Sequence, residues 1–193
     1  MLILILGIVL FLGVHSVRIA APDYRARFIA ERGEGAWKGL YTVVSVIGLA
    51  LIVWGFGMAR QTAPILYAPP AFMAHLALLL MIPAMVFLAA SQVPAGRIKA
   101  AVKHPMLLAV KIWALAHLLA NGDLASLILF LSFLAWAVAD RISEKRRLRA
   151  GETRAVVAGP ARNDIIAVGV GLVLYLLFVW KLHAWLIGVA PIA

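Results

Sequence analysis

The chain has 193 residues, of which 65% are hydrophobic and 13% are charged, and its mean hydropathy is +1.01. This composition excludes an ordinary soluble domain, and the apolar runs that recur from end to end predict an integral membrane protein. The net charge of +10 does not indicate nucleic-acid binding, because Lys and Arg fall in alternate loops and no basic face is interleaved with aromatic residues. The absence of cysteine excludes disulfides and thiolate ligation of iron.

Apolar runs predict six helices in one domain that covers residues 1–193. The first run has no basic n-region and no small-residue cleavage site, so it indicates a retained helix and not a signal peptide. Pro69-Pro70 starts the third helix and Gly122 is expected at the C′ position of the fourth. Asn163 or Asp164 is expected to cap the sixth helix, which then runs to residue 187. The first five predicted helices are residues 2–20, 37–58, 70–90, 104–121 and 124–139.

The distribution of Lys and Arg predicts the orientation of these helices. Five lie from Arg18 through Lys38, around the loop between the first two helices, three follow the third and seven follow the fifth, whereas the other two loops carry one and none. The positive-inside rule therefore places both termini outside and the three basic loops in the cytoplasm of a bacterium with this protein in its inner membrane. The fourth and fifth helices are short, so a re-entrant hairpin is the alternative to two full spans. The predicted fold is an all-α polytopic membrane bundle.

One face of the fourth helix carries the main candidates for chemistry. Trp113, His117 and Asn121 follow one another at i+4 steps and share this face. A histidine beside an aromatic ring inside a bundle can serve as an axial ligand of haem iron. Asn121 is expected to orient the imidazole through its other ring nitrogen. The alternative is a histidine that is hydrogen-bonded across helices.

The other histidines have simpler alternative interpretations. His15 lies in the inner half of the first helix and His75 in the outer half of the third, and either could make an interhelical hydrogen bond. Lys181 and His183, near the outer end of the last helix, are expected to anchor it at the membrane interface.

A second polar face of the fourth helix holds His104 and Lys111. His104 is expected at headgroup level, while Lys111 needs an anion, a carbonyl or water. Asp140 at the inner end of the fifth helix could supply a carboxylate to one of these bases. The sequence contains no zinc-type cluster, nucleophile motif or phosphate-binding glycine loop.

Three segments resemble the NnrU family of bacterial membrane proteins. They are residues 103–123 (KHPMLLAVKIWALAHLLANGD), 13–19 (GVHSVRI) and 182–189 (LHAWLIGV). The family is associated with nitrite and nitric oxide reductase genes, and it is similar to the membrane domain of plant zeta-carotene isomerase. That resemblance implies a b-type haem between helices and a carotenoid-like or other hydrophobic substrate, with membrane lipids and denitrification proteins as partners.

The resemblance implies His15 and His117 as the two axial ligands. A cysteine that can serve as a ligand in the isomerase aligns with Ala114 here, so that alternative is lost. Helical rise puts His15 roughly 10 Å and His117 roughly 20 Å from the cytoplasmic edge. Two axial ligands of one iron must lie at the same depth in the membrane. His75 is therefore the alternative to His15 as the partner of His117.

Three functions are therefore expected. The first is a haem-dependent membrane protein that acts in nitrite and nitric oxide metabolism or isomerises a polyene lipid. The second is a non-enzymatic assembly factor for a denitrification reductase. The third is a membrane methyltransferase, because the His-Pro start of the fourth helix also resembles isoprenylcysteine-type methyltransferases. Those enzymes carry an acidic, glycine-containing cofactor segment near the C-terminus, whereas the last basic loop of this chain has only Glu144 and Glu152 as acidic residues.

Overall fold

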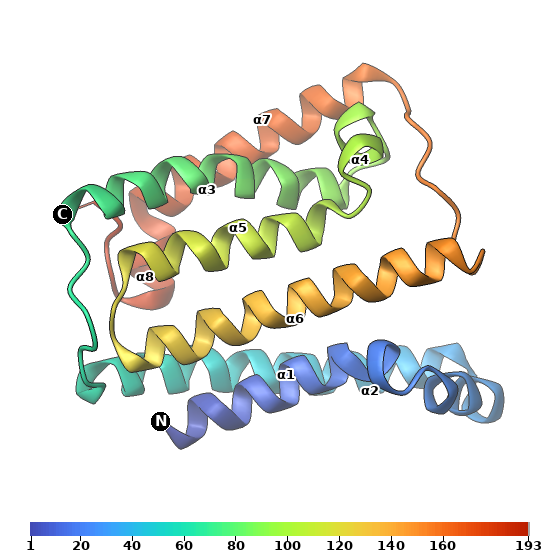
Figure 1. Cartoon of the computed structure of the whole chain (residues 1–193), viewed down its shortest axis with the longest axis horizontal. Coiled ribbons are helices and arrows are strands. Elements are labelled where there is room, and N and C mark those ends of the chain that lie inside the picture. Colours follow the sequence, from blue (N-terminus) through green and yellow to red (C-terminus); the bar gives the residue numbers. More distant parts are fainter. Residues whose placement is uncertain (193) are drawn as a thin grey trace.

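The computed structural model describes residues 1–192, which form a bundle of helices (Figure 1). Within these residues five helices are long and apolar enough to cross a membrane, the last of them continuous over Ala161–Ile187, and the apolar α5 is shorter. The prediction of a polytopic helical membrane bundle is confirmed. The elements are α1 Leu2–Ala20, α2 Pro22–Thr62, α3 Ala71–Gln92, α4 Arg97–Val102, α5 Pro105–Ala120, α6 Leu124–Arg149, α7 Ala161–Leu177, the π-helical turn η1 Phe178–Leu182 and α8 His183–Ile187.

The helices pack as two groups that meet between α5 and α6. In one group α1 lies along α2 and also contacts α6, and in the other α3 lies between α5 and α7. Buried apolar side chains of α1, α2, α5 and α6 form one core cluster, which includes Leu4, Ile8, Ile52, Leu129 and Phe130.

Small residues bring α1 and α2 together. A Cβ atom on Gly7 would lie 2.6 Å from the backbone nitrogen of Ile52, and one on Gly48 would lie 2.8 Å from that of Phe11. Each helix therefore uses glycine where it meets the backbone of the other. Without water to drive apolar association, such close van der Waals packing is a main source of helix–helix stability in a membrane.

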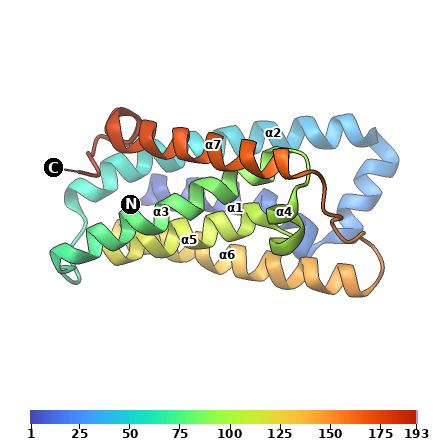
Figure 2. The ribbon, with the colours of Figure 1, turned by 90° about the horizontal axis from the view of Figure 1, so that it is seen from above.

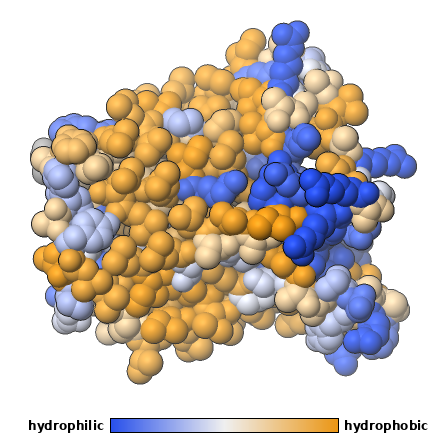
Figure 3. All heavy atoms as spheres, in the orientation of Figure 1, coloured by the Kyte–Doolittle hydropathy of each residue, from blue (hydrophilic) through white to orange (hydrophobic). Residues whose placement is uncertain are grey.

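The basic segments gather at one end of the bundle, called the basic end below (Figure 3). It consists of residues 18–38, 97–103 and 141–154. Both chain ends lie at the opposite end (Figure 1), which agrees with termini predicted on one side of the membrane.

Three of the predicted loops are helical at least in part. Residues 22–36 belong to α2, which bends where Gly33 adopts φ 83° (Figure 2), residues 97–102 form α4, and residues 140–149 continue α6. The predicted ends of these helices were wrong because the apolar run ends at the membrane boundary, whereas Arg, Lys and Glu favour helix as much as most apolar residues do.

The start of α7 also differs from the prediction. Asn163 and Asp164 lie inside the first turn and do not cap their own helix. Asp164 accepts hydrogen bonds from the backbone nitrogens of Arg97 and Ile98 (2.9 and 3.0 Å), while Asn163 donates to Ala95 O (2.9 Å). These side chains join α7 to the start of α4.

The turn after α5 is held by the segment between α2 and α3. The Tyr67 hydroxyl donates to the carbonyl oxygens of Leu118 and of Asn121 (2.7 Å for the latter), and Leu66 N donates to Gly122 O (2.8 Å). Gly122 follows the C-cap residue Asn121 and so lies at the predicted C′ position, but it has no positive φ, because the chain leaves α5 extended at Asn121. Gly122 is needed instead for its close contact with Tyr67 O.

Replacing Tyr67 with phenylalanine is expected to destabilise the protein by about 1–2 kcal/mol, because the last carbonyls of α5 lose their donor. Unfolding in detergent by increasing sodium dodecyl sulfate measures the change. Tyr24→Phe is the matched control, since Tyr24 and Tyr67 are similarly exposed (50% and 41%). Equal unfolding midpoints for the two variants would contradict a stabilising role for Tyr67.

Candidate functional site

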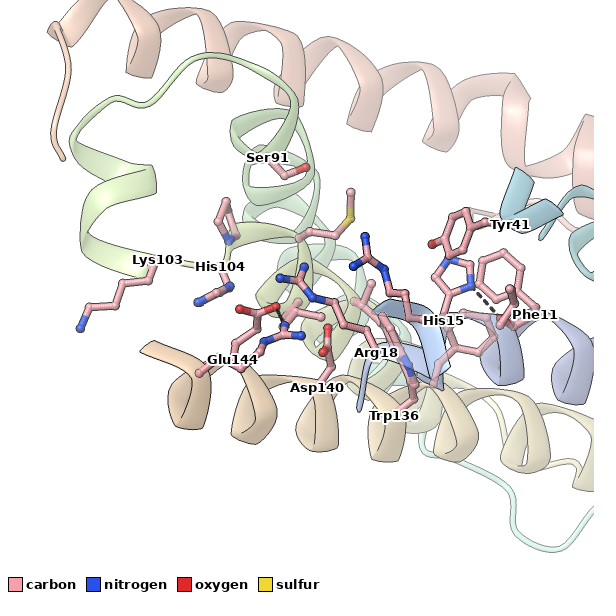
Figure 4. Close-up of a pocket in the computed structure, with 18 of the residues that line it drawn as sticks. Phe11, His15, Arg18, Tyr41, Ser91, Lys103, His104, Trp136, Asp140 and Glu144 are labelled. Carbon is pink, nitrogen blue, oxygen red and sulfur yellow. Dashed lines mark hydrogen bonds and ion pairs between the residues drawn. The ribbon is translucent and has the colours of Figure 1, made fainter. Parts of the chain in front are cut away.

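A cavity of about 790 Å³ lies at the basic end and extends into the bundle. Its walls come from α1, α2, α5 and α6, with single residues from α3 and α4. His15 and His104 both line it, and Figure 4 shows them at opposite ends with Arg18 between them. Its size falls within the ~300–1,000 Å³ that is usual for small-molecule and cofactor sites.

The end of the cavity at His15 is aromatic. The His15 ring centroid lies 4.2 Å from that of Phe11, 4.9 Å from Tyr41 and 5.8 Å from Trp136. The Nδ1–H of His15 donates to Phe11 O (2.6 Å). A neutral imidazole held in this way keeps its lone pair on Nε2, and metal-binding histidines are commonly oriented by this type of hydrogen bond.

The other end of the cavity is charged. Two carboxylates, Asp140 and Glu144, face a larger number of cations, and Glu144 forms an ion pair with Arg147. Three buried nitrogens beside the cavity, Arg147 Nε and Nη1 and Trp136 Nε1, have no hydrogen-bond partner among the described residues. This excess of cations and free donors favours an anionic group. The cationic residues of the lining are Arg18, Arg25, Lys38, Lys99, Lys103 and Arg147.

His104 precedes α5, where its backbone is held outside the helix by Pro105. Burial, followed by the positive charge of Arg141, lowers the pKa of the His104 imidazole, and these effects outweigh the nearby Asp140. His104 is therefore neutral at neutral pH and can accept a hydrogen bond in the cavity. Lys111, predicted on the same helix face, is not part of the cavity lining.

His117 lies about three turns further along α5 than Pro105, which lines the cavity. Its ring stacks on Phe130 (4.6 Å) and lies 5.3 Å from Trp113, so the predicted pairing of Trp113 and His117 is confirmed. The predicted role of Asn121 was wrong. Asn121 Nδ2 donates to the backbone oxygen of His117 (2.9 Å), whereas the imidazole Nδ1 is held by Trp113 O (2.8 Å).

The histidine beside His117 is His183, whose ring centroid lies 6.2 Å away. Sequence reasoning assigned His183 to membrane anchoring, because spacing along one helix cannot reveal a contact between α5 and α8. The π-helical turn Phe178–Leu182, which no simple sequence pattern marks, immediately precedes His183.

His15 and His117 occupy different surroundings. A run of aromatic contacts separates them, with Phe133 5.6 Å from Phe11 and 5.5 Å from Trp113. The cavity contains His15 and not His117, which agrees with the difference in depth expected from helical rise. His75 is exposed near the start of α3.

No group of three His, Asp or Glu side chains within residues 1–192 could hold a metal ion. The predicted pairing of Asp140 with a base is not among the ion pairs of these residues, which are Lys38–Glu34 and Arg147–Glu144. The histidines therefore remain the main candidates for ligation, singly or as a pair.

The family model described as "NnrU protein" matches residues 3–191. Comparisons with curated proteins and with solved structures gave no match. The family match covers nearly the whole chain, including the cavity and all five histidines. The chain is a multi-pass membrane protein that belongs to the NnrU family.

Proposed function

We propose that the protein binds haem b in the cavity at the basic end, with His15 as the ligand of the iron. The observation that carries this proposal is the combination of an imidazole with a free Nε2, an aromatic wall and a cationic rim around one cavity of about 790 Å³. A haem has an apolar macrocycle and two carboxylates at one edge, so it needs these surroundings at opposite ends of its site.

The residues of the cavity fit such a group. Phe11, Tyr41 and Trp136 supply apolar surface beside His15. Arg147 and the cations near it supply donors for propionate carboxylates, and two of the Arg147 nitrogens lack a partner. Haem bound there supplies one-electron chemistry and the binding of small gases. The protein's part is to hold the His15 tautomer, to exclude water with the aromatic wall and to neutralise the carboxylates.

The test is an optical spectrum of the full-length protein purified after haem-supplemented expression. A Soret band with close to one haem per chain is expected, together with α and β bands after reduction. A protein that is folded by circular dichroism but shows no Soret band, either as purified or after addition of haemin, would overturn the proposal.

A role in nitric oxide metabolism follows if one histidine alone holds the iron. His104 lies at the far end of the cavity and His117 outside it, so a haem held by His15 would have no second histidine beside it and would be able to bind a diatomic ligand. Nitric oxide is apolar and enters membranes freely. Adding nitric oxide to the reduced protein is expected to shift the Soret band, and an unchanged spectrum would exclude this role.

Isomerisation of a polyene lipid is the second candidate activity. It is favoured by Phe11 and Phe133, which both line the cavity with ring centroids 5.6 Å apart, so that a flat conjugated chain in the cavity would lie against aromatic rings. Incubating the reduced, haem-loaded protein with a cis-polyene and separating the isomers by chromatography tests it. Isomer ratios equal to those with free haem in the same detergent would rule it out.

A further inference from the structure

Lys111 lies within the apolar length of α5 and does not line the haem cavity. It is about 9 Å of helical rise beyond Pro105 at the start of the helix. Leu115, one turn further along α5, is 45% exposed, so this side of the helix faces lipid and not the core. A charged side chain at this depth needs a polar or anionic partner. The partner of Lys111 must therefore be sought outside the cavity.

Two more cations lie beside Lys111 on α6. Arg141 and Lys145 are one turn apart on that helix, and the positive charges of both repel the Lys111 ammonium group. Neither of them lines the cavity. Lys111, Arg141 and Lys145 are called the α5–α6 cation cluster below, because α5 packs along α6. Like charges from two helices therefore meet on the outside of this helix pair.

No carboxylate within residues 1–192 forms an ion pair with the α5–α6 cation cluster. The ion pairs of these residues are Lys38–Glu34 and Arg147–Glu144. Asp140 and Glu144, which precede Arg141 and Lys145 in the sequence, line the cavity on another face of α6. Charges of one sign repel one another most strongly where the surrounding dielectric constant is low, as it is at the edge of a membrane. An anion at the cluster would offset this repulsion.

The surface next to the cluster is apolar. On α6, Leu131, Val138 and Ile142 are 51%, 44% and 46% exposed. Figure 3, in which α5 and α6 lie toward the viewer, shows hydrophilic side chains reaching from the basic end into the hydrophobic surface over these two helices. The cluster and the apolar surface can therefore contact the charged headgroup and the acyl chains of one lipid.

We infer that the α5–α6 cation cluster binds the phosphate of one anionic phospholipid, whose acyl chains lie along α5 and α6. Basic sites between transmembrane helices on the cytoplasmic side bind acidic headgroups in this way. The guanidinium of Arg141 matches a phosphate with two parallel hydrogen bonds, and the flexible stems of Lys111 and Lys145 let their ammonium groups reach the same headgroup. A zwitterionic lipid carries its own cation and does not neutralise the cluster. Because the two groups of helices meet between α5 and α6, the bound lipid joins them.

The experiment is native mass spectrometry of the full-length protein, titrated with phosphatidylglycerol in neutral detergent. The wild type is expected to bind one phosphatidylglycerol at least about 10-fold more tightly than phosphatidylcholine. Lys111→Met, which keeps an apolar side chain, and Arg141→Gln should each weaken phosphatidylglycerol binding about 5-fold or more, the effect of one lost cation at an anionic headgroup. Arg27→Ala is the matched control, because Arg27 is an exposed cation of the basic end on α2, and it should leave binding unchanged.

Thermal unfolding, followed by tryptophan fluorescence, distinguishes lost lipid binding from lost folding. Without lipid, Lys111→Met should unfold at the wild-type temperature or above it, because one of three repelling charges is removed. Added phosphatidylglycerol should raise the midpoint of the wild type and change that of Lys111→Met much less.

Equal binding of phosphatidylglycerol and phosphatidylcholine by the wild type would overturn the inference, as would wild-type affinity in both Lys111→Met and Arg141→Gln. Displacement of the lipid by inorganic phosphate would also contradict it, since the cluster would then be a site for a free anion. Haem loading should be unchanged in both variants, because neither residue lines the cavity. Failure of the lipid site therefore leaves the haem proposal as it stands.

Discussion

Replacing His15 with alanine is expected to weaken haem binding at least about 100-fold, or about 2.8 kcal/mol. Among residues 1–192, His15 is the only histidine at the aromatic end of the cavity (Figure 4). Its removal leaves none of these side chains there with a free ring nitrogen whose tautomer is fixed by a hydrogen bond to a backbone carbonyl. Titration of haemin into the purified variant, followed at the Soret band, measures the loss.

His117→Ala is the control for this prediction. The family resemblance implies both histidines as ligands, but His117 lies beyond Trp113 and Phe133 from the cavity. Haem affinity in His117→Ala is therefore expected to remain within a few-fold of the wild type. Equal losses in the two variants would mean that the two side chains share one iron.

Replacing Gly7 with leucine is expected to prevent stable packing of α1 on α2. A Cβ atom at this position would lie 2.6 Å from Ile52 N and 2.9 Å from Leu51 C, so the backbones of the two helices must separate. Overpacking of a core site typically costs about 1–3 kcal/mol, and a clash with the backbone belongs at or above the upper end. We expect little folded protein in detergent extracts, as measured by size-exclusion chromatography.

Gly13→Leu supplies the matched comparison in the same helix. No atom lies within 4 Å of a Cβ at Gly13, which is exposed. This variant should elute as a single peak in wild-type yield. A normal yield from Gly7→Leu would show that α1 and α2 do not depend on close backbone contact.

The membrane bundle itself could be predicted from the sequence, because apolar length is dictated by the thickness of the bilayer. The start of α5 was also predicted closely, since Pro105 cannot continue a helix from its N-terminal side and marks the first turn. The extensions of α2 and α6 beyond the apolar runs were missed, because charged residues outside the membrane carry no hydropathy signal for a helix.

The sites were predicted less completely than the helices. Trp113 and His117 share a helix face, so their contact follows from helical spacing. Two neighbours of His15, Tyr41 and Trp136, come from α2 and α6, and one neighbour of His117, His183, comes from α8. Contacts of this kind depend on which helices pack against one another. The residue types also do not predict which backbone carbonyls accept hydrogen bonds from Nδ1 of His15, His117 and His183.

The most direct measurement of haem binding at His15 is the response of the reduced protein to carbon monoxide. If His15 alone held the iron, carbon monoxide would bind and shift the Soret band in the wild type and in His117→Ala alike, and this is the expected result. A wild-type spectrum of low-spin haem that ignores carbon monoxide and collapses in His117→Ala would contradict it.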